Sequence, residues 1–319
     1  MVVKGGDKMI TMMMQPDVAP MTWEDFCANK ERFSVAIDGF VNTGPRYQDP
    51  KHGGPRSNFN HHEEVDRFST RATCAQALID IRTGFFDAFR KDGQPHCTVY
   101  ANDCDQDVCT TWFLLKYGWM VQNVINPRLN KLVHMEDMLD TTGGAYPFPK
   151  DMPILQELAW IFQPYTAFRM SGGLNTRDPQ LFMDIVESVE HRIMKYIHNE
   201  GGSIPLDTRY ERIGGGTGWT MVREIGAQAR TGMLADGIKA FVSIRERADN
   251  RMNVTIGRMS NKTPFNVEQH LQDCSAAEPN QLAKWGGGNT IGGSDRSLGT
   301  EQTIEQLQQL IEQRISVAV

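Results

Sequence analysis

Short apolar runs alternate with helix-like segments in the first half of the chain, and this alternation constrains the fold more than any other feature. Residues 33–40 (FSVAIDGF) and 98–101 (TVYA) have the length and apolar character of buried strands. Residues 70–89 between them and 108–117 after them repeat apolar side chains at helical spacing. Strand, helix and strand in this order predict a βαβ unit and a mostly parallel sheet.

Further elements are expected on both sides of this unit. Residues 21–32 predict a short helix capped by Thr22, and residues 41–60, rich in glycine and polar side chains, predict a long functional loop. A short strand is expected at 131–134. Helices are expected at 152–168 and 179–198.

The character of the chain changes near residue 201, where glycine becomes dense. Residues 238–245 and 252–258 alternate like neighbouring strands joined by a turn, and residues 301–315 predict a C-terminal helix. A chain of 319 residues is longer than one core comfortably serves, so two domains are expected. The layout that follows is a flexible tail at 1–20, a metal-binding α/β catalytic domain with a mostly parallel sheet and bridging helices at 21–200, and a smaller, Gly-rich α/β substrate-binding domain at 201–319.

Composition narrows the class of partner. A net charge of −6 argues against binding to long duplex DNA, although a bound divalent cation would still allow small phosphorylated ligands. No apolar run is long enough to span a membrane, and the N-terminal segment lacks the apolar core of a signal peptide. The six cysteines show no CxxC spacing, which is typical of a reducing compartment. We therefore expect a cytoplasmic protein with no membrane partner.

Three aspartates, Asp103, Asp105 and Asp107, follow the second predicted strand and precede a helix. Their mutual repulsion in one loop is costly unless a cation compensates it. Carboxylates of this kind usually hold Mg²⁺ or Mn²⁺. A solvated acidic turn that caps the following helix is an equally good interpretation.

An adjacent histidine pair, His61 and His62, lies in the polar segment after the first strand, which ends at Asp38. Adjacent side chains diverge, so one histidine can bind a metal while the other orients a carboxylate or contacts a phosphate. Asp137 and Asp140 precede a glycine turn, and either could bridge two metals. The sequence does not choose between them, and a carboxylate at a helix N-terminus is the alternative.

The glycine run at 286–293 (GGGNTIGG) offers backbone N–H groups that could form an anion-binding nest. A plain flexible loop is the alternative, and no Walker A or dinucleotide spacing is present. A GxSxG nucleophile motif is also missing from the sequence. The candidate substrate-binding residues are Arg258, Gly286, Gly287, Gly288, Asn289 and Arg296.

Taken together, three segments resemble the DHH phosphoesterase family, which includes RecJ-like nucleases, nano-RNases, cyclic-dinucleotide phosphodiesterases and family II pyrophosphatases. NHHEEVDRFSTRATCAQAL resembles the Asp-His-His signature, and NDCDQDVCTTWFLLKYG resembles the first, acidic motif. Residues 252–293 resemble the accessory substrate-binding domain, with its Arg-x-Ser strand end and GGGH-type loop. The resemblance covers roughly two-thirds of the chain.

This chain departs from the family pattern in three ways. Asn60 stands where the signature has aspartate, and Asn289 stands where the glycine loop has histidine. The acidic motif also follows the histidine pair, whereas in the family it comes first. We favour a permuted catalytic domain over a standard order in which the first motif is missing.

The resemblance implies a metal-dependent phosphoesterase with two Mn²⁺ or Mg²⁺ ions and a metal-activated water. Its substrate would be a phosphodiester or phosphoanhydride in a small nucleotide-like molecule or short oligonucleotide, and a homo-oligomer is possible. The expected metal ligands are Asp38, His61, Asp103, Asp105, Asp107, Asp137 and Asp140, with His62 and Asp38 as catalytic residues. The alternative is a degenerate member that binds a nucleotide or a protein partner without turnover, motivated by Asn60 and Asn289.

Overall fold

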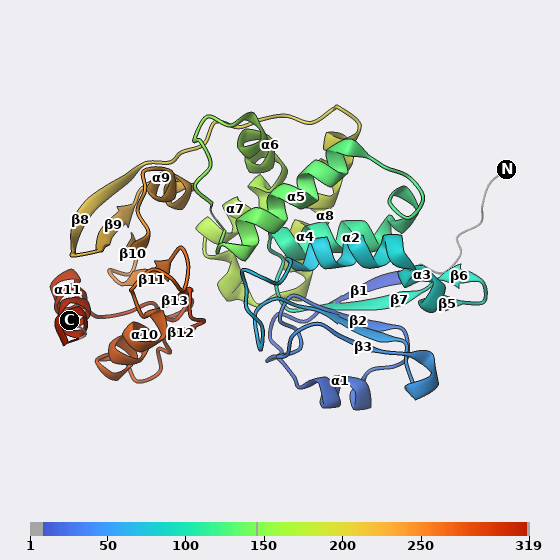
Figure 1. Ribbon diagram of the computed structural model, residues 1–319, viewed down its shortest axis with the longest axis horizontal. Coiled ribbons are helices and arrows are strands. Elements are labelled where there is room, and N and C mark those ends of the chain that lie inside the picture. Colours follow the sequence, from blue (N-terminus) through green and yellow to red (C-terminus); the bar gives the residue numbers. More distant parts are fainter. Residues whose placement is uncertain (1–8, 145, 318–319) are drawn as a thin grey trace. The chain divides into compact units, whose positions relative to one another are not determined.

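The computed structural model describes residues 9–144 and 146–317. The chain divides into two compact units: the first comprises Met1–Thr141 with Gln156–Ile204, and the second Thr142–Leu155 with Pro205–Val319. Each unit combines helices with a β-sheet (Figure 1), so the predicted α/β class is confirmed.

A mostly parallel five-stranded sheet forms the centre of the first unit. Its order is β1 (Ile10–Met14), β7 (Cys97–Ala101), β2 (Ser34–Ile37), β4 (Arg56–Phe59) and β3 (Arg46–Gln48). The first four strands are parallel to their neighbours, and β3 is antiparallel to β4. The strands predicted at 33–40 and 98–101 are confirmed as β2 and β7. Their carboxyl ends lie at one edge of the sheet, where α/β proteins usually place their sites.

Three strands of this sheet, β1, β3 and β4, lie where the sequence predicts none. Residues 41–60 are not one long loop, because β4 pairs with β2 along its whole length. This strand is missed because it is polar: Asn58 is buried, and its Nδ2 donates to the carbonyls of Thr43 and Gly44 at 2.9 and 3.0 Å. Strand β1 occupies part of the segment expected to be a flexible tail, and pairs with β7.

The helices of the first unit largely follow the predicted pattern. They are α1 (Trp23–Asn29), α2 (Thr73–Thr83), α3 (Phe85–Ala88), α4 (Gln106–Lys116), α5 (Pro127–Thr141), α6 (Pro153–Ile161), α7 (Gln163–Met170) and α8 (Pro179–Ile197). Thr22 caps α1 as predicted, accepting a hydrogen bond from the Asp25 N–H at 3.1 Å. The predicted 70–89 helix is interrupted at Gly84, which has a positive φ of 122°, and the predicted 152–168 helix is interrupted at Phe162.

The strand predicted at 131–134 is wrong, because these residues belong to α5. Leu129, Leu132, Val133 and Leu139 are buried and recur at helical spacing, so the apolar pattern is a helix face longer than the short run suggested. In Figure 1, α2, α4, α5 and α8 lie on one side of the sheet and α1 lies on the other. No helix in the described part of the chain is long and apolar enough to cross a membrane.

The second unit contains a six-stranded sheet. Its order is β12 (Gly286–Gly287), β13 (Ile291–Gly293), β11 (Met252–Arg258), β10 (Ala240–Glu246), β9 (Trp219–Glu224) and β8 (Tyr210–Gly216). Only β9 and β10 are parallel. Helices α10 (Val267–Ala276) and α11 (Ile304–Val317) contribute to one core, and α9 (Ala229–Ala235) to a second. The strands predicted at 238–245 and 252–258 and the C-terminal helix are confirmed.

Candidate metal centre

Four side chains of the first unit converge on one buried place. Asp38 follows β2, His61 follows β4, Asp107 lies in the first turn of α4, and Asp140 lies near the end of α5. Each offers one ligand atom, and these four atoms all lie within 4.8 Å of one another. The cluster could therefore hold a metal ion, and it unites four of the residues that the sequence nominated from distant parts of the chain.

Asp38 is placed by the sheet itself. Its backbone N–H donates to the Phe59 carbonyl at 2.9 Å, which extends the pairing of β2 with β4 by one residue. The residue then takes a left-handed conformation with a φ of 50°, which aspartate tolerates better than most side chains. The Thr73 hydroxyl at the start of α2 donates to Asp38 Oδ1 at 3.3 Å. The carboxylate is therefore held at the carboxyl edge of the sheet.

Asn60 shapes the turn that carries the histidines. Its Oδ1 accepts hydrogen bonds from the backbone N–H groups of His61 and His62 at 2.8 and 3.1 Å. Its Nδ2 donates to the carbonyls of Val41 and Thr43 at 3.1 and 2.8 Å. The residue is fully buried, and only an amide can both accept and donate in this way. The turn therefore requires asparagine at this position.

His61 is the least satisfied polar residue of the cluster. Its side chain is completely buried, and neither ring nitrogen has a hydrogen-bond partner among the described residues. Nε2 lies 2.6 Å from Asp140 Oδ2, which also lacks a hydrogen-bond partner there, and 3.6 Å from Asp38 Oδ1. His61 Nε2 and Asp140 Oδ2 thus approach one another closely without hydrogen-bond geometry, and a convergent set of this kind suits an ion. One imidazole with three carboxylates is a donor set that Mn²⁺, Mg²⁺ or Zn²⁺ accepts.

The charges of the cluster are unbalanced. Burial alone would lower the pKa of His61, but the facing carboxylates of Asp140 and Asp38 raise it to about 10. Burial, with the carboxylates of Asp140 and Asp38, raises the pKa of Asp107 to about 7. Burial and the same group of carboxylates also raise the pKa of Glu136, one helical turn before Asp140. Despite burial, the histidines and Arg67 lower the pKa values of Asp38 and Asp140, whereas the ionised forms of Asp107 and Glu136 are disfavoured, a cost that a bound cation would relieve.

Asp107 and Asp137 accept hydrogen bonds from backbone N–H groups at the start of α2. The two carboxylate oxygens of Asp107 accept the N–H groups of Thr73 and Cys74, both at 2.7 Å. Asp137 accepts the N–H of Ala72 at 2.8 Å. Carboxylates stabilise a helix N-terminus, where backbone N–H groups lack partners.

The choice between Asp137 and Asp140 follows from these contacts. Asp137 accepts the Ala72 N–H through Oδ1 and pairs with Arg71 through Oδ2 at 2.7 Å, and it belongs to neither candidate metal-binding group among the described residues. Asp140 faces His61 and belongs to the four-residue cluster. The geometry therefore brings Asp140 to the candidate site and gives Asp137 the helix-terminal position that the sequence left open as the alternative.

The other two predicted aspartates lie beside the cluster and are not among its four members. Asp105 caps α4 by accepting the Val108 N–H at 3.0 Å, and Asp103 accepts the Cys104 N–H at 2.7 Å. Burial and the charges of Asp38 and Asp103 raise the pKa of Asp105. The helix-capping interpretation of the acidic turn thus describes Asp105, whereas Asp107 belongs to the cluster.

His62 belongs to a second candidate grouping with Asp38 and His61, again within 4.8 Å. Its Nε2 lies 2.7 Å from Asp38 Oδ1, and its Nδ1 lies 3.2 Å from Arg67 Nη1. Sequence reasoning missed Arg67 because an arginine in a polar segment has no distinguishing pattern. The one sequence signal for Arg67 is its position five residues after the histidine pair.

In the second unit, Arg258 contacts the glycine run but through backbone carbonyls. Its Nε donates to the Asn289 carbonyl at 2.8 Å and its Nη1 to the Thr263 carbonyl at 3.2 Å. The run itself forms the hairpin of β12 and β13, and the Gly288 N–H donates to the Ile291 carbonyl at 2.9 Å. This segment is therefore neither the plain loop nor a fully open nest that the sequence suggested.

The remaining glycines and Arg296 are placed around this hairpin. Gly286 and Gly287 form β12, and Arg296 follows β13. The Arg296 carbonyl accepts a hydrogen bond from Arg247 at 3.3 Å. Among the described contacts, the Arg258 side chain binds the hairpin, whereas the Arg296 carbonyl accepts a hydrogen bond from Arg247.

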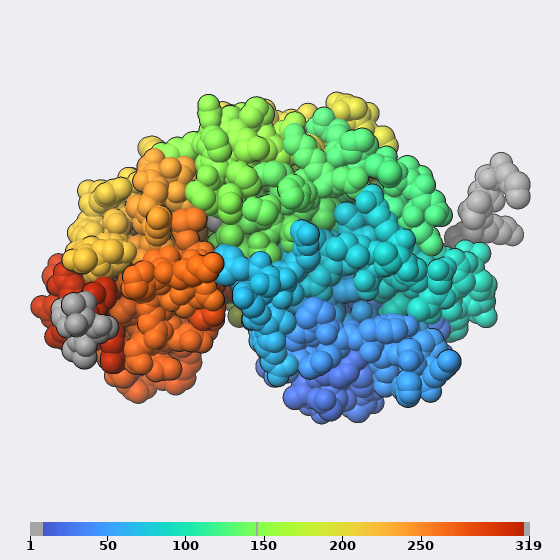
Figure 2. Space-filling model, in the orientation of Figure 1, coloured from blue at the N-terminus to red at the C-terminus, as the bar shows by residue number. Residues whose placement is uncertain are grey.

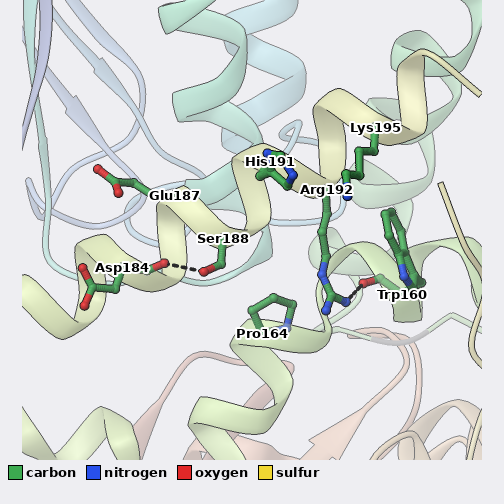
Figure 3. A pocket seen from close by; sticks show the side chains of 8 residues that line it. All are labelled: Trp160, Pro164, Asp184, Glu187, Ser188, His191, Arg192 and Lys195. Carbon is green, nitrogen blue, oxygen red and sulfur yellow. Dashed lines mark hydrogen bonds between the residues drawn. The ribbon is translucent and has the colours of Figure 1, made fainter. Parts of the chain in front are cut away.

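A shallow hollow of about 670 Å³ lies on another part of the first unit (Figure 3). Its walls are formed by Trp160, Pro164, Asp184, Glu187, Ser188, His191, Arg192 and Lys195. The Arg192 guanidinium lies 5.1 Å from the Trp160 ring, so this indole already has a partner. None of the cluster residues contributes to the walls, and the hollow is therefore separate from the candidate metal centre.

Comparison with protein-family models finds no match for this chain, and a search of curated proteins finds none either. The functional argument therefore depends on the cluster and on the residues around it.

Proposed function

We propose that this protein is a divalent-metal-dependent phosphoesterase of the DHH type. The observation that carries the proposal is the convergence of Asp38, His61, Asp107 and Asp140, whose buried ligand atoms include unpaired ones. The resemblance of three segments to that family supplies the reaction class. The proposed substrate is a phosphodiester or phosphoanhydride in a small nucleotide-like molecule or a short oligonucleotide.

The cluster has one solvent-facing side. The side chains of His61, Asp107 and Asp38 are 0%, 1% and 5% exposed, whereas those of Asp140 and His62 are 18% and 29% exposed. A phosphate group would approach from the side of His62 and Asp140. A divalent ion held there would polarise phosphoryl oxygens and lower the pKa of a bound water.

Within this proposal, the chain's own residues have distinct tasks. His61 and the three carboxylates would hold the cation, and Asp38 and His61 belong to both candidate groupings. His62 would contact the substrate or orient Asp38. The second unit would serve as the substrate-binding domain, with Arg258 and the β12–β13 hairpin contributing to phosphate or nucleotide recognition.

The second candidate function is binding of a nucleotide or a protein partner without turnover. Asn289, which stands where the resembled family has histidine, favours it. Asn60 carries less weight for this candidate, because its amide organises the histidine turn through both its donor and acceptor groups.

Metal analysis and a substrate panel test the proposal together. The purified protein should retain Mn²⁺ or a similar ion, and hydrolyse members of a panel of phosphodiesters, pyrophosphate and short oligonucleotides when Mn²⁺, Mg²⁺ or Co²⁺ is supplied. His61→Ala should lose both properties, whereas His134→Ala, at an exposed position on α5, should retain them. Metal-independent behaviour in both variants would refute the proposal, and retained metal with nucleotide binding but no turnover would favour the second candidate.

A further inference from the structure

Arg67 reaches back from the segment after the histidine pair to the edge of the cluster. Its Nη1 lies 3.2 Å from His62 Nδ1, and its Nη2 donates to the Asp140 carbonyl at 2.8 Å. The same Nη2 lies 3.4 Å from Asp140 Oδ1. Figure 2 shows the segment that follows the histidine pair, in light blue, on the surface of the first unit. The Arg67 side chain itself is only 17% exposed, so its guanidinium is turned inward.

In a neutral His62 ring, the contact with Arg67 determines which nitrogen carries the proton. A guanidinium keeps its protons and has no acceptor, so His62 Nδ1 must be the acceptor. The ring proton then lies on Nε2, which donates to Asp38 Oδ1 at 2.7 Å. Both nitrogens of His62 are thereby occupied, and neither has a lone pair left for a metal ion.

The neighbouring histidine is in the opposite condition. Both nitrogens of His61 lack hydrogen-bond partners among the described residues, and its Nε2 faces three carboxylates of the cluster. Two adjacent histidines of the same type are thus differentiated by one arginine. Of the two candidate cation groupings, only the one formed by Asp38, His61, Asp107 and Asp140 does not depend on His62 as a ligand.

We propose that Arg67 is a positioning residue that reserves His61 for the metal ion, by fixing His62 as a hydrogen-bond donor to Asp38. Its second contact, with the Asp140 carbonyl, holds the end of α5 against the histidine turn. The inference rests on the proposed metal centre for its consequence, but the hydrogen-bonding state of His62 is a property of the metal-free protein.

Arg71 provides a matched control. It belongs to the same segment, four residues after Arg67, and also pairs with an α5 aspartate, at 2.7 Å. That aspartate is Asp137, which lies outside the cluster. Arg67→Met and Arg71→Met therefore remove the same charge from the same segment, and only Arg67→Met removes the contact with His62. Arg67→Lys keeps the charge but cannot bridge two partners with a planar fork.

The first measurement uses the metal-free, full-length protein labelled with ¹⁵N in histidine. Long-range ¹H–¹⁵N spectra, with His62 assigned from a His62→Gln variant, should show a protonated Nε2 and an unprotonated Nδ1. Arg67→Met should shift the His62 signals toward a mixture of tautomers, and Arg71→Met should leave them unchanged. If Arg67→Met does not fold, Arg67→Lys takes its place. A proton on His62 Nδ1 in the wild type, or signals that ignore the loss of Arg67, would overturn the inference.

The second measurement is Mn²⁺ affinity by titration. Loss of a residue that orients metal ligands typically weakens affinity by about 10- to 100-fold, which is the effect expected for Arg67→Met. Arg71→Met should stay within about twofold of the wild type, since Asp137 is not a cluster member. If the wild type binds no Mn²⁺, the proposed metal centre fails while the spectra still decide the role of Arg67. If Arg67→Met binds Mn²⁺ as tightly as the wild type, the inference fails and the centre stands.

Discussion

Buried carboxylates in the two units are treated in opposite ways. In the second unit, Glu278 is 3% exposed, yet the chain surrounds it with donors. The Trp285 Nε1 and Thr300 hydroxyl donate to its Oε2, and the Glu301 N–H donates to its Oε1 at 3.2 Å. Burial alone would raise the pKa of Glu278, but the hydrogen bonds from Thr300 and Trp285 lower it.

In the first unit, donors from the chain reach Asp107 and Asp38 but not every carboxylate oxygen in and around the cluster. Asp140 Oδ2 and Glu136 Oε2 have no hydrogen-bond partner among the described residues, and burial with neighbouring carboxylates raises the pKa of Glu136. The difference separates two uses of buried charge. A carboxylate whose partners come from the chain stabilises the fold, whereas one without them is neutralised by a proton or by a cation from outside.

The largest loss of stability is expected from a substitution at Glu278, the buried carboxylate that the chain surrounds with hydrogen-bond donors. Glu278→Gln replaces an oxygen acceptor by an amide group that faces the Trp285 and Thr300 donors or the Glu301 N–H. We expect a loss of about 3 kcal/mol in the free energy of unfolding, measured by urea denaturation. Glu268→Gln, exposed at the start of α10, should cost less than about 0.5 kcal/mol. Equal losses in the two variants would show that the Glu278 hydrogen bonds do not stabilise the unit.

The dependence of stability on pH should report on the shifted pKa values of the cluster. The folded-state pKa of His61 lies above its ordinary value of 6.5, at about 10, so its stabilising contribution is complete below pH 6.5 and is lost as the pH rises toward 10. The folded-state pKa of Asp107 is raised from 3.8 to about 7. Its contribution to stability is therefore complete below pH 3.8 and is lost as the pH rises toward 7. These two groups should make the metal-free protein less stable in alkaline solution.

Added Mn²⁺ should reverse this trend, because metal ligands must be deprotonated. Its stabilisation should be larger at pH 8 than at pH 6, and reach about 2.7 kcal/mol at a hundredfold excess over the dissociation constant. Urea denaturation with EDTA and with Mn²⁺ provides the comparison, with His61→Ala as the control that should not respond. Stabilisation by Mn²⁺ that is greater at pH 6 would contradict a site built from His61 and Asp107.

A smaller loss is expected when the resembled signature is restored. Asn60→Asp replaces the Nδ2 donor with an oxygen that faces the Val41 and Thr43 carbonyls and Glu63 Oε2. We expect a loss of about 1–2 kcal/mol at neutral pH, measured by thermal or urea unfolding. Asn123→Asp, at an exposed position, is the control and should change little. A gain in stability from Asn60→Asp would mean that the amide is not what the turn requires.

The smallest effect should also have the opposite sign. Glu136→Gln removes a carboxylate that is surrounded by Asp140, Asp107 and Asp38 and has an unpaired oxygen. In the metal-free protein we expect no loss, or a gain of up to about 1 kcal/mol. Compared with Glu278→Gln, the same substitution distinguishes the two kinds of buried carboxylate. A loss above about 1 kcal/mol would show that Glu136, like Glu278, stabilises the fold.

Apolar patterns predicted much of this fold. Strands β2 and β7 and the cap of α1 at Thr22 follow from local sequence, because burial and capping both act over a few residues. Strand β4 could not be predicted this way. Its buried side chain Asn58 is satisfied by carbonyls 14 and 15 residues away, and such partners exist only in the folded chain.

The candidate site shows the same limit. Asp38, His61 and Asp107 were nominated from strand ends and motifs, but the choice of Asp140 over Asp137 depends on how α5 is rotated against α2. Asp137 pairs with the Ala72 N–H and with Arg71, whereas Asp140 faces His61. Arg67 escaped notice because its partners are 5 and 73 residues away in the chain.

The double attachment of Asp107 has a consequence for how this chain can change over evolutionary time. It holds the first turn of α2 through two backbone N–H groups while it faces the cluster, whereas His61 makes no hydrogen bond with the described residues through its ring. Under the proposed function, we expect His61 to change first in a descendant that no longer needs the activity and Asp107 to persist, because selection for folding continues to act on it. Retained aspartate at this position is therefore a poor marker of activity in any relative, and the histidine is the informative one.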